Sequence, residues 1–218
     1  MKTLKMLAIG TLLAANFITA QSTNEVNFGV KAGANFANLS GSGVTSNDAK
    51  FGAYGGAFVN IPISNKISVQ PEVLYSMQGT KWTTNTPNFL PLMDLKLEND
   101  IQLDYVNVPI VVQYEFGNGF YGEMGPQVGF LVGAKSKNEM TIDDRNFTPT
   151  VTNITSTTTD IKSLLKTADF SGVIGAGYKL PTGLSFNARY SIGFTDIDKA
   201  NTQAKNSVFS LGLGYTFQ

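Results

Sequence analysis

Apolar and polar residues alternate in one segment after another from residue 22 onward, and no helical period appears between them. Successive side chains of a β-strand point to opposite faces, so this alternation is typical of strands that have one apolar face. An even number of such strands is usual in bacterial outer-membrane barrels. Eight segments show the pattern: 27–36, 50–62, 66–78, 101–116, 120–133, 169–180, 184–194 and 206–217.

The connections between these segments alternate in length. Three are short turns, at Ile63–Asn65, Gly117–Gly119 and Pro181–Gly183. Short turns on one side and long loops on the other are typical of a barrel with periplasmic turns and extracellular loops. We therefore predict an all-β, eight-stranded antiparallel up-and-down transmembrane β-barrel with both termini on the periplasmic side. The long loops are predicted at 37–49, 79–100, 134–168 and 195–205.

The turns also predict which residues face each other. If Phe116 lies opposite Phe120, Gln113 faces Glu123 and shares the polar face of that hairpin with Glu115. In the same way Leu180 is expected opposite Leu184, and Ile61 opposite Ile67. The register with Ile61 opposite Ile67 predicts Gly56 opposite Glu72. The register with Leu180 opposite Leu184 predicts Gly175 opposite Arg189. Small residues opposite large ones suit the narrow lumen of an eight-stranded barrel.

Alternation alone leaves open a soluble ligand-binding barrel with an apolar interior. Three features favour the membrane instead. With the faces inverted, the water-facing surface would hold many glycines and few charges. The chain also closes on the alternating strand "LGLGYTF". Finally, aromatic residues gather near the strand ends of the apolar face, as in interfacial girdles: Phe28, Phe36, Phe116, Phe120, Tyr190, Phe194, Tyr215 and Phe217. We therefore expect the bacterial outer membrane, with its lipid as the principal partner.

Composition narrows the functions further. Sixteen basic and sixteen acidic residues give no net charge, which argues against a nucleic-acid partner. The sequence contains no His and no Cys, which removes His-dependent catalysis and most zinc sites. Carboxylate pairs such as Asp143-Asp144 lack the spacing of a known calcium loop. We expect no enzymatic activity, no cofactor and no metal site.

The first residues have the layout of a signal peptide. Lys2 and Lys5 precede an apolar stretch from Met6 to Ile18, and Ala20 offers a cleavage site. The predicted organisation is a signal peptide at 1–20 and one barrel domain at 21–218.

Polar residues on the inward faces form the candidate site. Buried charges are costly unless they are paired, so we expect a hydrogen-bonded network that fills the lumen. The hypothesised pairs are Glu72–Arg189, Glu115–Lys179 and Glu123–Lys31. A proton or ion path is the alternative to structural packing. The predicted network comprises Lys31, Glu72, Gln113, Glu115, Glu123, Gln127, Lys179 and Arg189.

Two of the long loops have distinctive sequences. Residues 148–160, "TPTVTNITSTTTD", are Thr-rich and are expected to be exposed and flexible. The 79–100 loop is apolar at Trp82, Phe89 and Leu90. These residues either belong to a fourth strand that extends above the membrane and packs on its neighbours, or form a candidate surface contact.

Several segments resemble a known family. "VQPEVLYSMQG", "LDYVNVPIVVQYEF", "GEMGPQVGFLVG" and "GVIGAGYKLPTGLSFNARYSIGF" are similar to the PorT-like outer-membrane β-barrel family of Bacteroidetes. The resemblance covers nearly all of the expected mature chain. It implies an eight-stranded barrel, and the founding member of the family belongs to a protein-secretion apparatus.

From the sequence we expect a monomeric barrel with a plugged polar lumen. Its expected role is a structural or interaction component of the cell surface that contacts envelope or secretion proteins. Small-solute transport is the alternative, although eight strands leave little lumen for a channel.

Overall fold

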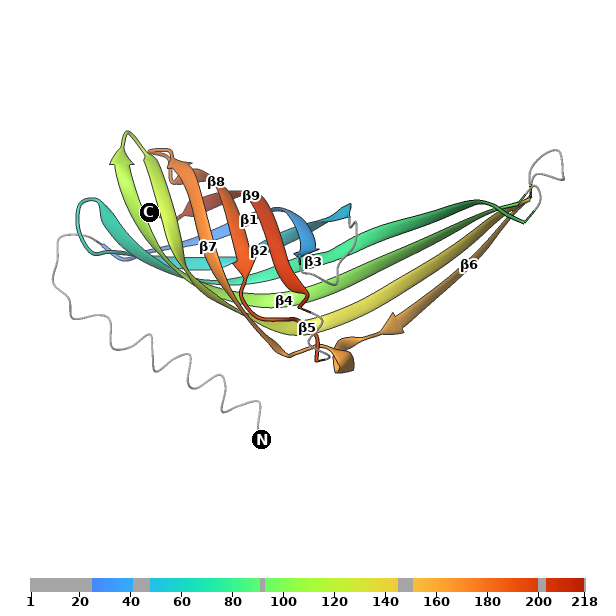
Figure 1. The fold of residues 1–218 in the computed structure, drawn as a ribbon. Coiled ribbons are helices and arrows are strands. Elements are labelled where there is room, and N and C mark those ends of the chain that lie inside the picture. Colours follow the sequence, from blue (N-terminus) through green and yellow to red (C-terminus); the bar gives the residue numbers. More distant parts are fainter. Residues whose placement is uncertain (1–24, 41–47, 91–92, 145–150, 200–202, 218) are drawn as a thin grey trace.

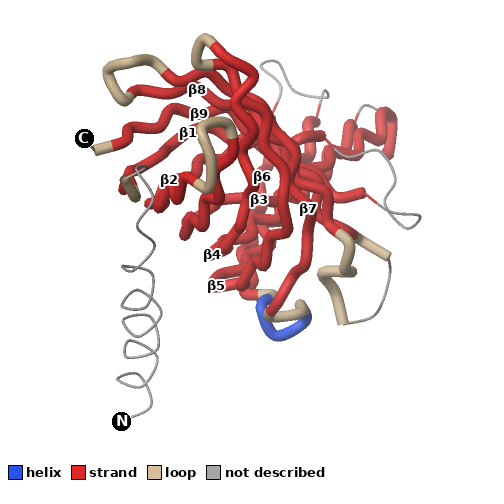
Figure 2. Tube along the Cα trace, turned by 90° about the vertical axis from the view of Figure 1, so that its left-hand side faces the viewer, coloured by secondary structure: helices blue, strands red, loops and turns tan. Residues whose placement is uncertain are grey.

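The computed structural model describes residues 25–40, 48–90, 93–144, 151–199 and 203–217. The predicted signal peptide, residues 1–20, lies outside the described residues. Strands make up most of the described chain, and a short 3-10 helix, η1 (Lys162–Leu164), is drawn in blue at the lower edge of Figure 2. No helix in the described part is long and apolar enough to cross a membrane. The strands are β1 (Asn27–Ser40), β2 (Asp48–Pro62), β3 (Ile67–Leu90), β4 (Met93–Gly117), β5 (Phe120–Asp144), β6 (Val151–Asp160), β7 (Ala168–Lys179), β8 (Leu184–Gly193) and β9 (Lys205–Thr216).

Eight of these strands close into a ring. The order around it is β1-β2-β3-β4-β5-β7-β8-β9, and all neighbouring pairs are antiparallel. The ring closes where β1 pairs with β9, from Gly29 opposite Thr216 to Ser40 opposite Lys205. Every strand of the ring therefore has a neighbour on both sides, which satisfies the backbone in lipid. The predicted eight-stranded antiparallel barrel is confirmed.

Two of the three predicted hairpin registers are confirmed along the strands, but at the β4–β5 turn an irregularity between Glu115 and Gly117 places Gly117, not Phe116, opposite Phe120. Gln113 faces Glu123 across β4 and β5, and Gly175 faces Arg189 across β7 and β8. The register of β2 and β3 was wrong by two residues, because Phe58 instead of Gly56 lies opposite Glu72.

The physical reason lies in the turn between β2 and β3. The amides of Ile63 and Ser64 both donate to the carbonyl of Ile67, so the turn is centred one residue later than expected. This moves the register by two residues, and every side chain therefore keeps its predicted face.

The outer surface of the ring is apolar and the interior is polar. Val112, Met124 and Ile174 are exposed on the outside, whereas Glu72, Glu123 and Arg189 are buried inside. This arrangement excludes the alternative of a soluble barrel with an apolar interior. Aromatic pairs lie near both ends: Phe120 with Tyr178 and Tyr215 with Phe217 at the turn end, and Phe36 with Phe51 at the other.

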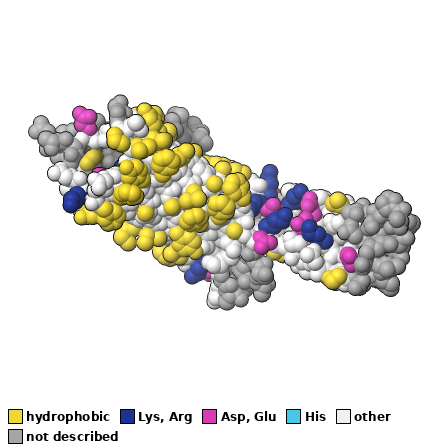
Figure 3. Space-filling view, turned by 90° about the horizontal axis from the view of Figure 1, so that it is seen from above, with side chains coloured by type: hydrophobic (Ala, Val, Ile, Leu, Met, Phe, Trp, Pro, Cys, Tyr) yellow, Lys and Arg dark blue, Asp and Glu magenta, His cyan; other side chains and the backbone are white. Residues whose placement is uncertain are grey.

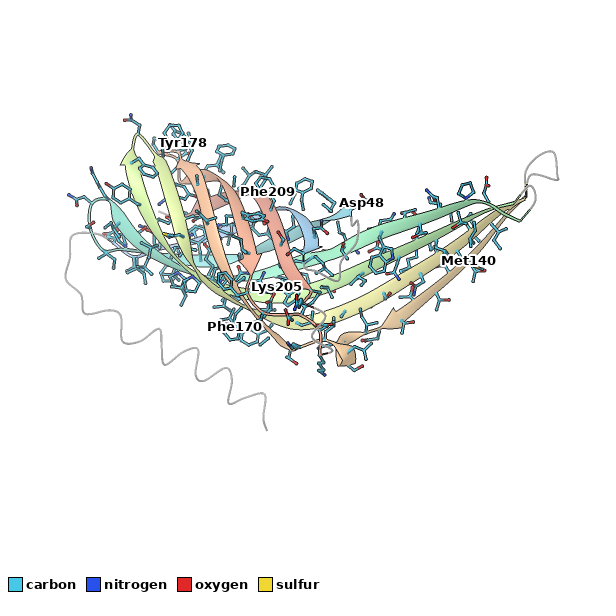
Figure 4. The ribbon with its side chains drawn as sticks, in the orientation of Figure 1. Asp48, Met140, Phe170, Tyr178, Lys205 and Phe209 are labelled. Carbon is cyan, nitrogen blue, oxygen red and sulfur yellow. The ribbon has the colours of Figure 1, made fainter. Side chains whose placement is uncertain are left out.

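Three strands continue far beyond the ring. The outer parts of β3, β4 and β5 stay paired, and β6 adds a fourth strand along β5, as in the row Lys81, Asp100, Lys137 and Thr158. Figure 1 shows these strands leaving the barrel as one long projection, and Figure 4 places Met140 far along it. We call residues 81–90, 93–100, 135–144 and 151–160 the arm.

The arm corrects the expectation of loops at 79–100 and 134–168. Much of this sequence is ordered strand, including most of the Thr-rich stretch that was expected to be flexible. Threonine is β-branched and favours strands, and its cross-strand pairing stabilises a sheet. Trp82 is half-buried at the root of the arm, opposite Asn99. The side chains of Phe89 and Leu90 lie outside the described residues.

The outer surface changes from apolar to charged where the arm begins. On β3 the exposed Met77 is followed on the same face by Lys81, whose Nζ lies 3.4 Å from Glu98 Oε1. Figure 3 shows apolar side chains over the barrel and charged ones gathered at the start of the arm. This change marks the upper boundary of the lipid-facing band.

Candidate functional site

Four charged side chains from four strands meet in the middle of the lumen. They are Lys31 of β1, Glu72 of β3, Glu123 of β5 and Arg189 of β8, and we call them the charged quartet. Arg189 Nη1 donates to Glu72 Oε2 at 2.7 Å, and Nη2 donates to Oε1 at 2.7 Å. Arg189 Nε and Nη2 also donate to the two oxygens of Glu123, at 2.5 and 2.9 Å. Lys31 Nζ donates to Glu72 Oε1 at 2.7 Å. Two acids and two bases leave the quartet neutral.

Amide side chains complete the contacts of the quartet. Gln70 Nε2 donates to Glu72 Oε1 at 2.7 Å, and Gln113 Nε2 donates to Glu123 Oε2 at 3.0 Å. Sequence reasoning omitted Gln70 from the network, although its position two residues before Glu72 places it on the same strand face. A buried ion network is stable when further hydrogen bonds satisfy its polar atoms, and these two bonds reach the carboxylate oxygens of Glu72 and Glu123.

The structure brings some of the predicted partners together and separates others. Glu72 and Arg189 meet, as hypothesised. The hypothesised Glu123–Lys31 pair was wrong, because Glu123 binds Arg189 and Lys31 binds Glu72. The tilt of the strands brings both carboxylates to one guanidinium, whose five donors serve two acids at once.

The remaining predicted residues lie above and below the quartet. Lys179 Nζ donates to Gln113 Oε1 at 2.9 Å and lies 5.0 Å from the centre of the Tyr121 ring. The ion pairs of the described residues do not join it to Glu115, so that hypothesised pair is corrected. Glu115 lines the same turn-end space as Lys179. On the other side of the quartet, Gln127 Nε2 donates to Ser171 Oγ at 3.0 Å.

A glycine makes room for the guanidinium. Gly175 lies opposite Arg189, and a Cβ added to it would lie 2.9 Å from Arg189 Cγ and 3.0 Å from Glu123 Oε1. It would also approach the carbonyl oxygen of Ala188 to 2.7 Å. Such distances are too short for carbon, so the position requires glycine for the network to keep its geometry.

A buried apolar cluster lies on the extracellular side of the quartet. The alternation pattern did not predict this cluster, although Ile197 and Leu165 are apolar residues in stretches predicted to be loops. We call this cluster the cap. Its buried members are Leu103, Tyr105, Leu131, Ala134, Ile197 and Ala204, and Leu39, Ile101, Ile161 and Leu165 pack against them.

A cavity of about 240 Å³ lies on the turn side of the quartet. Its floor includes the buried side chains of Lys31, Gln70 and Gln113. We call it the turn-end cavity. The full lining is Asn27, Lys31, Phe58, Asn60, Gln70, Gln113, Tyr121, Lys179, Leu180, Gly183, Ser185 and Thr216.

The arm carries different chemistry on its two faces. One face bears ion pairs: Lys96 Nζ lies 3.2 Å from Glu98 Oε1, and Lys137 Nζ lies 2.6 Å from Glu139 Oε1. The opposite face holds Leu97 beside Met140, and both are exposed. Within the described part of the chain, no three acidic side chains gather as a metal site would require.

Comparison with known proteins shows the family to which the chain belongs. The sequence profile of the outer membrane protein beta-barrel domain matches residues 19–199. No curated protein matches the sequence.

Three solved structures are similar in outline. Neisserial surface protein A is 14% identical, with 89% of this chain and 100% of that chain covered and a TM-score of 0.48. The attachment invasion locus protein Ail of Yersinia pestis, solved with the heparin analogue sucrose octasulfate, is 12% identical with the same coverage and a TM-score of 0.45. CarO of Acinetobacter baumannii is 9% identical, with 86% and 97% covered and a TM-score of 0.36.

Proposed function

Because this chain belongs to the outer membrane protein β-barrel domain family and resides in the bacterial outer membrane, we propose that it is an interaction protein whose barrel anchors the extracellular arm. The arm contacts a protein partner of the envelope or of a secretion complex. The resemblance to the PorT-like family supports the second class of partner. We propose no enzymatic role, since the four charged side chains of the quartet are held by one another.

A closed lumen would favour an interaction role over transport. The charged quartet lies in the middle of the barrel and the cap on its extracellular side, and we infer that together they close it. A solute would have to break the ion pairs of Arg189 and also separate the packed side chains of Leu103 and Tyr105, which are almost fully buried.

The arm is the observation that carries the proposal. It projects beyond the lipid-facing band and exposes Ile154, Leu97 and Met140 to 68, 41 and 39%. Within the described residues, β6 pairs with β5 along one edge and with no strand along the other. Unpaired edges of this kind accept an extended segment of a partner through main-chain hydrogen bonds.

The test removes the outer part of the arm, which carries Leu97, Met140 and Ile154, and keeps the barrel; we call the shortened protein the armless form. Residues 84–97 and 140–155 are each replaced by an Asn-Gly turn, because Thr84 pairs with Leu97 and Met140 with Thr155, and such a turn joins paired strands. Whole cells that express either form are cross-linked, and the proteins captured with the barrel are compared.

We expect a partner with the intact protein that is lost from the armless form, which still folds and reaches the outer membrane. The substitution Lys66→Met, which removes one exposed charge in the turn between β2 and β3 and leaves the arm in place, is the control. Equal capture by the intact and armless forms would refute the proposal.

A further inference from the structure

We propose that the turn-end cavity binds a small oxyanion, a carboxylate or a phosphate, that enters from the periplasm. The inference concerns the inside of the barrel and is independent of the role of the arm.

The described residues that line the cavity include two lysines and no carboxylate. Lys31 is engaged with Glu72 in the charged quartet. Lys179 donates one hydrogen bond, to Gln113 Oε1, and takes part in none of the ion pairs of the described residues. An ammonium group has three donors, so Lys179 has capacity for an anion inside the cavity.

Neutral donors surround the same space. Ser185 and Thr216 line the cavity and carry hydroxyl groups that can donate, whereas Asn60 Nδ2 already donates to Ser68, Gln70 and Gln113. Lys31, Gln70 and Gln113 are 5, 3 and 3% exposed, so the floor of the cavity is withdrawn from bulk water. Interactions between an anion and the half-buried ammonium group of Lys179 are stronger in such surroundings than at an open surface.

The size of the cavity limits the ligand. A water molecule takes about 30 Å³ in the liquid, so a cavity of about 240 Å³ holds an anion of the size of phosphate or succinate with a few waters. Glu115, which lines the adjoining space of about 160 Å³ with Lys66 and Lys179, is the acidic group that competes for Lys179.

The cavity opens toward the periplasm. Leu180 and Gly183 belong to the turn between β7 and β8, and Asn27 and Thr216 lie at the turn-side ends of β1 and β9. The quartet and the cap lie between the cavity and the extracellular side. An anion therefore enters and leaves on the periplasmic side, and binding does not lead to passage.

The test is a titration of the mature protein, folded in detergent, with inorganic phosphate and, separately, with succinate. Binding is followed by isothermal calorimetry and by the NMR signals of the lysine ammonium groups. We expect one of the two anions to bind and to shift the Lys179 signal. Lys179→Met should weaken binding by roughly tenfold or more, the range of one charged hydrogen bond. Lys179→Arg should retain much of the affinity.

Lys135→Met, an exposed charge on the arm, is the matched control and should leave the affinity unchanged. Circular dichroism and thermal unfolding show whether each variant folds. Binding of both anions with equal affinity would assign the site to oxyanions as a class. Absence of binding at about 10 mM of either anion, or equal binding by folded Lys179→Met, would overturn the proposal. The armless form should bind like the intact protein, which separates this test from that of the arm.

Discussion

Arg189 and Glu72 are 117 residues apart in the sequence and face each other across the lumen through two hydrogen bonds of 2.7 Å. The guanidinium and the carboxylate form a bidentate ion pair with two parallel hydrogen bonds, a geometry that makes such pairs both strong and directional. Both side chains are almost fully buried. Because the same guanidinium also holds Glu123, one side chain joins β3, β5 and β8 at the centre of the barrel.

The first prediction follows from that central position. Arg189→Met removes the cation and leaves Glu72 and Glu123 buried with Lys31 as their remaining cation in the quartet. Breaking a buried ion network in this way costs about 3–5 kcal/mol. Denaturant unfolding of the folded barrel should show a loss of that order. A loss below about 0.5 kcal/mol, as is usual for surface substitutions, would contradict the assigned role.

A double-mutant cycle isolates the pair itself. Glu72→Gln, Arg189→Met and the combined variant should show an interaction energy of about 0.5–3 kcal/mol, the range for residues in contact. Additive effects would mean that the observed hydrogen bonds carry no coupling.

The second prediction concerns the glycine opposite Arg189. Gly175→Ala places a methyl group against Arg189 and Glu123 and should destabilise the barrel by about 1–3 kcal/mol, as overpacking does. Gly55→Ala is the matched control, because its Cβ would meet neighbours at 3.7 Å and 3.9 Å, which is ordinary contact. Equal unfolding free energies of the two variants would show that the space at Gly175 is not required.

The sequence predicted the barrel well because two independent patterns agreed. Alternation gave the face of each strand, and tight turns such as Gly117–Gly119 gave the pairing across β4 and β5. The predicted β2–β3 register was wrong because the turn after Pro62 has no residue that requires one particular geometry. The sequence therefore left two adjacent positions possible for the centre of the turn. The faces survived the error because a shift by two residues preserves them.

The same patterns did not predict the arm, and they predicted two ion pairs wrongly, Glu123–Lys31 and Glu115–Lys179. Above the membrane no lipid selects an apolar face, so β6 keeps strand-forming threonines without the alternation that marks a membrane strand. Lys31 was assigned to Glu123 because pairing across the lumen depends on strand tilt and stagger, which local sequence does not encode. Glu72 and Arg189 could be paired because both lie near the middle of their strands.

The third prediction concerns Glu98 in the arm. Its hydrogen bond with Lys96, together with the charge of Lys81, lowers the pKa of the Glu98 carboxyl below its ordinary value of about 4.3. A lowered folded-state pKa means that the contribution of these ion pairs to arm stability is present above the ordinary value and is lost as the pH falls through the lowered one.

Carboxyl NMR titration of the folded protein should show this shift. Lys96→Met should move the pKa of Glu98 back toward its ordinary value, and added salt should weaken the shift because the pair is partly exposed. A pKa for Glu98 that is unchanged by Lys96→Met would show that the hydrogen bond to Lys96 is not its cause.

The central claim is that side chains close the lumen, so that the protein acts through its surface and not by conduction. Planar-bilayer recording of the folded protein tests this claim most directly, with a porin as the positive control. We predict no stable open currents from the intact protein. Stable open currents that depend on the inserted protein would contradict the closed lumen and would favour small-solute transport.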